Sequence, residues 1–205
     1  MRSTLARSWQ PAPVPDIGVT GGRIGDVVTA DVSVRVAWPA DAAGIAAVQV
    51  RRWQEQYDAS ATAFLDGAGV GVDDLAAAWA ASLARPPEAR FRALVALARV
   101  EVTGFALTGP CSDADADPAT DGELSEFTVD PGHRRAGHGS RLLQACADTL
   151  TADGFTRATC WIATTDDVLR AFLTDSGWAA DGASRELADA TGAGVKQVRL
   201  HTALA

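Results

Sequence analysis

The chain has 205 residues, of which 47% are hydrophobic and 21% charged, and its net charge at pH 7 is −8. These values are typical of an ordinary soluble protein with one sizeable core, and the acidic balance argues against nucleic acid as the main partner. No run of eighteen apolar residues occurs, and residues 1–30 lack the apolar core of a signal peptide. We therefore expect no membrane partner and a cytoplasmic location. The three cysteines have no metal-ligand spacing, which predicts reduced thiols and no metal site.

The first thirty residues differ in composition from the rest of the chain. Three prolines and four glycines fall between positions 11 and 25, with little hydrophobic periodicity. This composition predicts a flexible N-terminal extension over residues 1–30, followed by a single domain over residues 31–205.

Strand and helix patterns alternate in the next part of the chain. Alternation of apolar and polar residues predicts strands, and apolar residues at helical spacing predict helices. Asp41 and Asp73 are the candidate N-caps of two helices, and the first of these helices reaches Tyr57. The expected strands are residues 32–36, 91–98 and 100–108, the last two antiparallel.

An acidic loop is expected over residues 109–122. Its Asp113-x-Asp115-x-Asp117 spacing is similar to the start of a calcium loop. A calcium loop also needs glycine at its sixth position and glutamate at its twelfth, where this chain has Pro118 and Leu124. We therefore expect a solvated loop that holds no metal and at most attracts a cationic ligand.

A strand, a glycine turn and a helix follow this loop. The strand ends at Val129, the turn contains Gly137 and Gly139, and an apolar-periodic helix begins directly after it. Glycines let the backbone approach an anion closely, and the first amides of a helix have no internal partner. The turn is therefore predicted to hold a phosphorylated cofactor, with Arg134 and Arg135 adding positive charge.

Two familiar phosphate loops do not fit this turn. A P-loop ends in Gly-Lys-Ser/Thr, but Ser140 follows Gly139, and a dinucleotide fingerprint needs a third glycine where Leu142 stands. The pattern Arg134-x-x-Gly137-x-Gly139 instead resembles the Arg/Gln-x-x-Gly-x-Gly/Ala motif of the GNAT superfamily, the acyl-CoA-dependent N-acyltransferases.

The order of the expected elements extends this resemblance over residues 32–204. After the turn we expect a helix of about fifteen residues, a strand at 157–163, a helix at 166–176 and a closing hairpin of 178–187 with 195–202. The crossover helix makes the strand at 157–163 parallel to the strand that ends at Val129. The implied fold class is α/β (α+β), the GNAT fold, with a mixed central sheet of about six to seven strands flanked by about four helices.

The resemblance implies an enzyme that moves an acetyl group from acetyl-CoA to a primary amine of a small molecule or peptide. A homodimer is among the assemblies that it allows. In the family, amides of the motif hold the pyrophosphate of coenzyme A, and amides of the central strand polarise the thioester carbonyl. The cofactor-binding residues implied here are Phe127, Thr128, Val129, Arg134, Arg135, Ala136, Gly137, His138, Gly139, Ser140, Asp166 and Phe172.

Three residues are candidates for proton transfer. The resemblance puts Glu123 at the position of the family's glutamate base, fourteen residues before Gly137. Glu126 is the alternative, on the opposite face of the strand because an offset of three is odd. Tyr57, the only tyrosine of the chain, is a candidate for the acceptor site or for the acid.

Two positions depart from the family pattern. Asp166 replaces the usual asparagine and Leu173 replaces the usual tyrosine, and leucine cannot donate a proton to the leaving thiolate. Tyr57, Ser125 or a water molecule could replace this acid. An alternative hypothesis is a GNAT-fold accessory protein that binds acyl-CoA with little or no catalysis. A third is an unrelated α/β domain with a fortuitous glycine turn.

Overall fold

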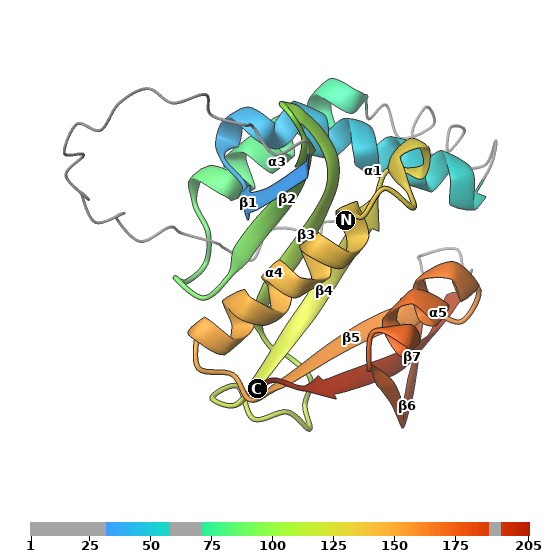
Figure 1. The fold of residues 1–205 in the computed structure, drawn as a ribbon. Helices are drawn as coiled ribbons and strands as arrows, with labels where there is room; N and C mark the ends of the chain where they lie inside the picture. The colour runs from blue at the N-terminus through green and yellow to red at the C-terminus, as the bar shows by residue number, and fades with distance from the viewer. Residues whose placement is uncertain (1–31, 58–70, 189–193) are drawn as a thin grey trace. The chain divides into compact units, whose positions relative to one another are not determined.

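A computed structural model describes residues 32–57, 71–188 and 194–205 (Figure 1). The expected N-terminal extension and the side chain of Tyr57 lie outside the described part of the chain. In chain order the elements are β1 (Val32–Val36), η1 (Pro39–Asp41), α1 (Ala42–Tyr57), α3 (Val72–Ala84), β2 (Arg92–Ala98), β3 (Glu101–Pro110), β4 (Asp121–Val129), η2 (Pro131–His133), α4 (His138–Ala152), β5 (Arg157–Ala163), α5 (Asp167–Asp175), β6 (Ala179–Ala188) and β7 (Gly194–Ala203). Within these ranges no helix is long and apolar enough to cross a membrane.

The strands form one seven-stranded sheet in the order β1-β2-β3-β4-β5-β7-β6. β4 and β5 are parallel, as predicted from the crossover helix between them, whereas β1–β2, β5–β7 and β6–β7 are antiparallel. The mixed sheet and the four α-helices of the described ranges confirm the predicted fold class.

The chain forms two compact units, and the division between them passes through β3, β4 and α4. The first unit contains the described residues up to Ala106 together with Phe127–Ala145, and the second contains Leu107–Glu126 with Cys146–Ala205. Each unit has its own buried apolar side chains. They are Ile45, Val48, Val95 and Phe105 in the first, and Leu124, Leu150, Ile162 and Leu173 in the second.

The helix starts in the first unit differ from those expected. α1 begins at Ala42, and the Asp41 carboxylate before it accepts a hydrogen bond from the Trp38 amide at 2.7 Å. α3 begins one residue before the expected cap Asp73, and the Asp74 carboxylate accepts from the Gly71 amide at 2.8 Å. Each carboxylate accepts a hydrogen bond from the backbone amide three residues before it. This is one of the two hydrogen bonds of a capping box.

The second unit agrees closely with the sequence expectation. β5 has the predicted bounds, and α4 is fifteen residues long. α4 ends at Ala152, and Gly154 shortly after it has a φ of +89°, the left-handed conformation expected of a glycine C-cap. Asp166 precedes α5, and its carboxylate accepts from the Leu169 amide at 3.1 Å, so this residue is an N-cap.

Candidate active site

The turn before α4 is fixed by Asp130, which lies in the first unit. The Asp130 amide donates to the Thr103 carbonyl at 2.8 Å, and its carboxylate accepts from the Gly132 amide at 2.8 Å and from Arg51 Nε at 2.7 Å. Hydrogen bonds from Gly132 and Arg51 hold the pKa of this carboxyl below its ordinary value although burial opposes them. The turn therefore starts from a defined point at the end of β4.

The backbone of the turn fits an anion. Arg135 and Gly137 both have positive φ, +62° and +83°, on either side of Ala136. Turns with such residues direct successive amides into one concavity, and the first amides of α4 continue this row. A Cβ atom at Gly137 would lie 2.5 Å from Arg141 Nη1, so the Arg141 guanidinium lies across the glycine. The donor set is therefore suited to a phosphate group, and its role in holding the cofactor stays a prediction.

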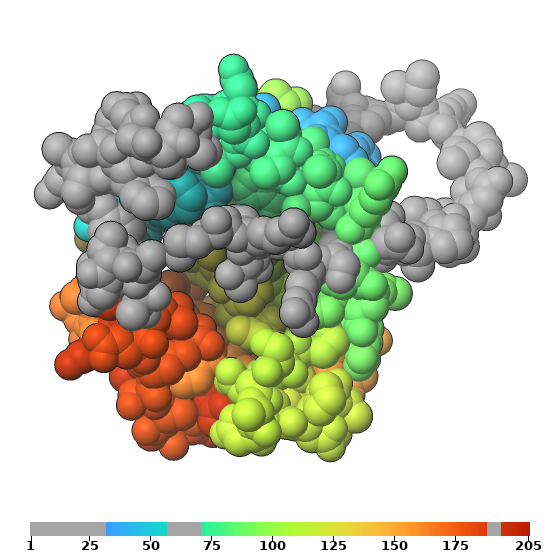
Figure 2. Space-filling view, turned by 180° about the vertical axis from the view of Figure 1, so that it is seen from behind, coloured from blue at the N-terminus to red at the C-terminus, as the bar shows by residue number. Residues whose placement is uncertain are grey.

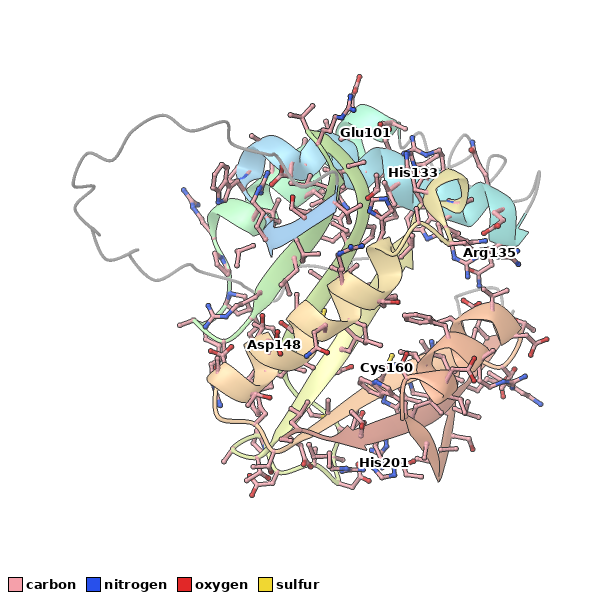
Figure 3. The ribbon with its side chains drawn as sticks, in the orientation of Figure 1. Glu101, His133, Arg135, Asp148, Cys160 and His201 are labelled. Atoms are coloured by element: carbon pink, nitrogen blue, oxygen red, sulfur yellow. The ribbon has the colours of Figure 1, made fainter. Side chains whose placement is uncertain are left out.

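The two arginines of the motif have different surroundings. Arg134 donates two hydrogen bonds of 2.5 Å to the Glu55 carboxylate, which also lowers the pKa of Glu55. Arg135 is exposed at the turn (Figure 3). The exposed Arg141 is a cation that the sequence analysis did not include. Its position four residues after Gly137 could have indicated it, because helical residues four apart lie on one face.

His138 contributes its backbone rather than its side chain to this turn. The imidazole is only 3% exposed, and its Nδ1 lies 2.9 Å from the Thr103 hydroxyl. Burial, followed by the charges of His133 and Arg141, lowers the pKa of His138. The side chain therefore anchors the first turn of α4 to β3, and the amide is the group that can face a ligand.

The end of β4 presents backbone amides in a defined direction. The Asp130 amide bonds to Thr103 of β3. Successive amides of a strand point to opposite edges, so the Val129 and Phe127 amides face away from β3, whereas the Thr128 amide faces towards it. Of the three predicted carbonyl-polarising residues, Phe127 and Val129 thus have the favourable orientation.

The two glutamates of β4 lie in the second unit and face in opposite directions. A Cβ atom at Gly122 would lie 2.7 Å from Leu150, which places α4 on the face of residues 122, 124 and 126. Glu123 lies on the other face of the strand. The predicted difference in direction therefore follows from the strand geometry.

The pKa values of both carboxyl groups are raised above that of an ordinary glutamate. Burial and then the charge of Asp113 raise the pKa of Glu123. The Glu126 side chain is reached by solvent, yet the protein atoms around it desolvate the carboxyl and raise its pKa to about 7. A carboxylate of this kind can accept a proton more readily than an ordinary surface glutamate.

A first prediction concerns the stability of the fold. Because the pKa of Glu126 rises from its ordinary value of 4.5 to about 7 on folding, the native state binds more protons than the unfolded state between these values. The free energy of unfolding therefore falls as pH rises through this window. Glu126→Gln is expected to raise the thermal midpoint at pH 8 and to change it less at pH 4.5, measured by calorimetry. Glu101→Gln, at an exposed position of β3, is the control, and an equal effect of both variants at both pH values would contradict the prediction.

Three residues at the start of α5 or within it have structural roles. The sequence alone did not separate these roles from a role in the site. The Asp166 carboxylate caps the helix, and Phe172 is half-buried. Leu173 is completely buried, so it belongs to the core of the second unit. A tyrosine at this position would overpack the core, and Leu173→Tyr is therefore a poor way to restore an acid.

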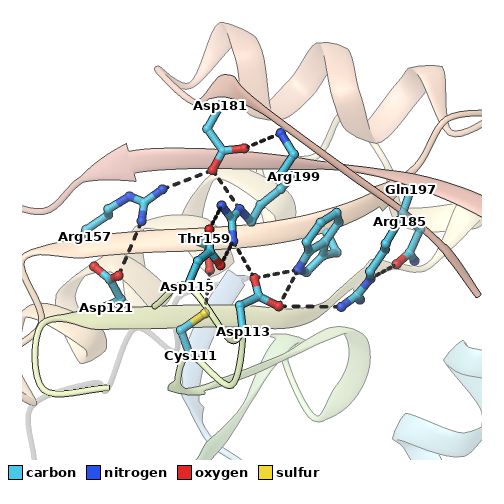
Figure 4. A network of polar contacts seen from close by, with 12 residues as sticks. Cys111, Asp113, Asp115, Asp121, Arg157, Thr159, Asp181, Arg185, Gln197 and Arg199 are labelled. Atoms are coloured by element: carbon cyan, nitrogen blue, oxygen red, sulfur yellow. Dashed lines mark hydrogen bonds and ion pairs between the residues drawn. The ribbon is translucent and has the colours of Figure 1, made fainter. Parts of the chain in front are cut away.

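Most residues of the acidic loop are exposed, as the sequence predicted, but two of its carboxylates are paired within the protein. Asp113 and Asp115 both bind Arg199 of β7, with Nη1–Oδ2 and Nη2–Oδ2 distances of 2.9 and 2.6 Å. Arg199 lowers the pKa of Asp115 to about 2. In the view of Figure 2, the yellow-green loop lies against the red strand of the same unit. Asp113 and Asp115 are thus paired with a cation more than eighty residues away, which weakens their expected role in attracting a cationic acceptor (Figure 4).

The turn of the first unit is a candidate site for a phosphorylated cofactor, and the two carboxylates of the second unit are candidates for proton transfer. Residues 52–178 match the model of the acetyltransferase (GNAT) family. The chain therefore belongs to the GNAT acetyltransferase family, as the motif and the element order predicted.

Solved structures share the fold at low sequence identity. YncA from Salmonella typhimurium, solved with its cofactor acetyl-CoA, is 19% identical with a TM-score of 0.60, over 86% of this chain and 95% of that chain. An N-acetyltransferase from Staphylococcus aureus Mu50 is 16% identical with a TM-score of 0.63, over 86% and 100%. The PaiA N-acetyltransferase from Thermoplasma acidophilum, in complex with coenzyme A, is 14% identical with a TM-score of 0.62, over 84% and 98%. Among curated proteins no sequence match is found.

Proposed function

We propose that the protein is an N-acetyltransferase that moves an acetyl group from acetyl-CoA directly to a primary amine of a small molecule or peptide. The observation that carries this proposal is the turn before α4, whose left-handed residues and helix amides suit a phosphate. Family membership supports the acyl transfer, and two structural neighbours were crystallised with acetyl-CoA or coenzyme A. A cytoplasmic location and a homodimer are the expected context.

The chain would hold the cofactor mainly through backbone groups. The amides of residues 136–140 would bind the pyrophosphate, with the exposed guanidiniums of Arg135 and Arg141 adding positive charge. Acetyl-CoA, when bound, supplies the acetyl group as a thioester with a thiolate leaving group. The amides of Phe127 and Val129 would donate to the carbonyl oxygen, because preorganised donors stabilise charge that develops there.

Glu123 is the proposed general base. An ammonium group is not a nucleophile, so one proton must leave the acceptor nitrogen before the nitrogen attacks. Glu123 accepts that proton, and the raised pKa of its carboxyl favours this role. Glu126 is the second candidate, favoured by a pKa of about 7.

A replacement for the family's acid is needed, because Leu173 is buried and apolar. Ser125 is exposed on β4 and carries a hydroxyl. Ser125, Tyr57 and a water molecule are the candidates for protonating the thiolate. A coenzyme A thiolate is a tolerable leaving group, so a strong acid is not required.

The test is calorimetric titration of the protein with acetyl-CoA and with coenzyme A, followed by thiol release against a panel of amines. We expect dissociation constants on the order of 1 μM to 1 mM, the usual range for enzyme substrates, and release of thiol with at least one amine. Binding without release on a broad panel would favour the accessory protein that binds acyl-CoA. No binding of either ligand would overturn the interpretation of the turn.

A further inference from the structure

The C-terminal half of α1 contacts the segment that leads into the anion-binding turn, and both belong to the first unit (Figure 1). Arg51 donates through Nε to the Asp130 carboxylate at 2.7 Å, and its Nη2 contacts the same oxygen. One helical turn later, the Glu55 carboxylate accepts two hydrogen bonds of 2.5 Å from the Arg134 guanidinium. Residues four apart on a helix lie on one face. One face of α1 therefore holds both ends of residues 130–134.

The Glu55 carboxylate is held by two arginines. Arg52 donates to its Oε2 at 2.8 Å from within α1, and Arg134 donates to both of its oxygens. The side chains of Arg134 and Glu55 are 31% and 38% exposed. An exposed ion pair contributes little to stability, but two parallel hydrogen bonds between a guanidinium and a carboxylate fix the orientation of both groups. The contact is therefore better suited to direct the chain than to stabilise the fold.

Arg134 stands directly before the left-handed part of the turn. Its backbone is extended, with a φ of −68° and a ψ of 157°, whereas Arg135 after it has a φ of +62°. The direction of the amides of residues 136–140 depends on where this change of conformation begins. The Arg134 guanidinium has two of its nitrogens on Glu55, so α1 fixes the position of that point.

We propose that Arg51, Glu55 and Arg134 are positioning residues, through which α1 directs the amides of the turn towards the pyrophosphate of the cofactor. The proposal rests on the proposed function in that the turn holds coenzyme A. It gives the first arginine of the motif a contact with the protein instead of a contact with the phosphate. It also makes the affinity for the cofactor depend on α1, a helix that does not itself form the turn.

The negative charge of Glu55 separates positioning from direct binding of the phosphate. By charge alone, Glu55→Gln would raise the affinity for an anionic cofactor. The same variant would free the Arg134 guanidinium for the phosphate, if binding the phosphate were its role. If α1 positions the turn, Glu55→Gln instead lowers the affinity, because glutamine offers Arg134 one acceptor oxygen where the carboxylate offers two. The two roles therefore predict changes of opposite sign.

The test is calorimetric titration of the full-length protein and its variants with coenzyme A, with the thermal midpoint measured on each preparation. We expect Glu55→Gln and Arg134→Gln each to weaken binding by roughly two- to fivefold, the range of a well-oriented exposed ion pair. The double variant should bind no more weakly than the weaker single variant, because the two residues form one contact. Glu88→Gln is the matched control and should leave the affinity unchanged, since Glu88 is 46% exposed and pairs with Arg90 at 2.9 Å in the same unit.

Two further variants separate geometry from charge. The exchange Glu55→Arg/Arg134→Glu restores an ion pair and should bind coenzyme A more tightly than Glu55→Gln/Arg134→Gln, which has the same net charge but no ion pair. Arg51→Lys keeps the positive charge but loses the contact of two nitrogens with Asp130. We expect weaker binding in Arg51→Lys, which a role of Arg51 through its charge alone does not predict.

The outcomes separate this proposal from its alternatives. Unchanged or higher affinity in Glu55→Gln would overturn it, and higher affinity would make Arg134 a direct ligand of the phosphate. Losses of affinity that follow the thermal midpoint in every variant, Glu88→Gln included, would overturn it and leave the contacts structural. The expected losses in a protein that transfers no acetyl group would support the positioning and count against the proposed function. No binding of coenzyme A by the unaltered protein would overturn both.

Discussion

Glu123→Gln is expected to lower kcat/KM for acetyl transfer by on the order of 10²- to 10⁴-fold, the usual contribution of a general base. Glutamine keeps the size of the side chain, but it cannot take a proton from the acceptor ammonium. The dissociation constant for coenzyme A should change little, since the proposed cofactor contacts are backbone groups of residues 136–140. Steady-state kinetics and calorimetry on the same preparation measure both quantities.

The pH dependence identifies which glutamate acts. The base must be ionised, so kcat/KM rises with pH through the pKa of that group in the free enzyme. If Glu126 were the base, this rise would be centred near pH 7 and Glu126→Gln would abolish it. A large loss in Glu126→Gln with little loss in Glu123→Gln would contradict our assignment. Glu101→Gln is the control for removal of an exposed strand carboxylate.

The parts of the fold that depend on local pattern could be predicted from the sequence. β5 has the expected bounds because its alternating residues are flanked by clear turn signals. The length of α4 follows from apolar periodicity, and its end at Ala152 follows from the left-handed cap at Gly154. The glycine turn was recognisable because its function depends on the backbone, which two glycines at fixed spacing specify directly.

The parts that depend on contacts between distant residues could not be predicted. The sequence predicts that β6 and β7 form a hairpin, but it does not specify that β7 rather than β6 lies beside β5. That choice brings Arg199 to Asp113 and pairs a carboxylate of the exposed loop with a distant cation. The pairing of Arg134 with Glu55 has the same origin, since these residues are 79 positions apart. The partners of charged side chains are therefore the feature that could least be predicted from the sequence.

Gly137→Ala is expected to weaken binding of coenzyme A by roughly five- to thirty-fold. An L-residue in the left-handed conformation costs about 1–2 kcal/mol, and Gly137 has a φ of +83°. The new Cβ would also approach Arg141 Nη1 to 2.5 Å, so the guanidinium must move. The turn can relieve this strain by leaving the left-handed conformation, but its amides then face away from the phosphate. Restoring their direction on binding costs the same free energy, which calorimetry measures as lost affinity.

Gly154→Ala separates this effect from ordinary destabilisation. Gly154 has a similar φ of +89°, and a Cβ there would meet no atom within 4 Å. The substitution should lower the thermal midpoint by a comparable amount, but it lies at the end of α4, away from the turn, and should leave the affinity for coenzyme A unchanged. Equal loss of affinity in both variants would mean that the weaker binding results from lower stability of the whole fold. Unchanged affinity in Gly137→Ala, and in the Gly137→Ala/Gly139→Ala double variant, would mean that the turn does not hold the cofactor through its backbone.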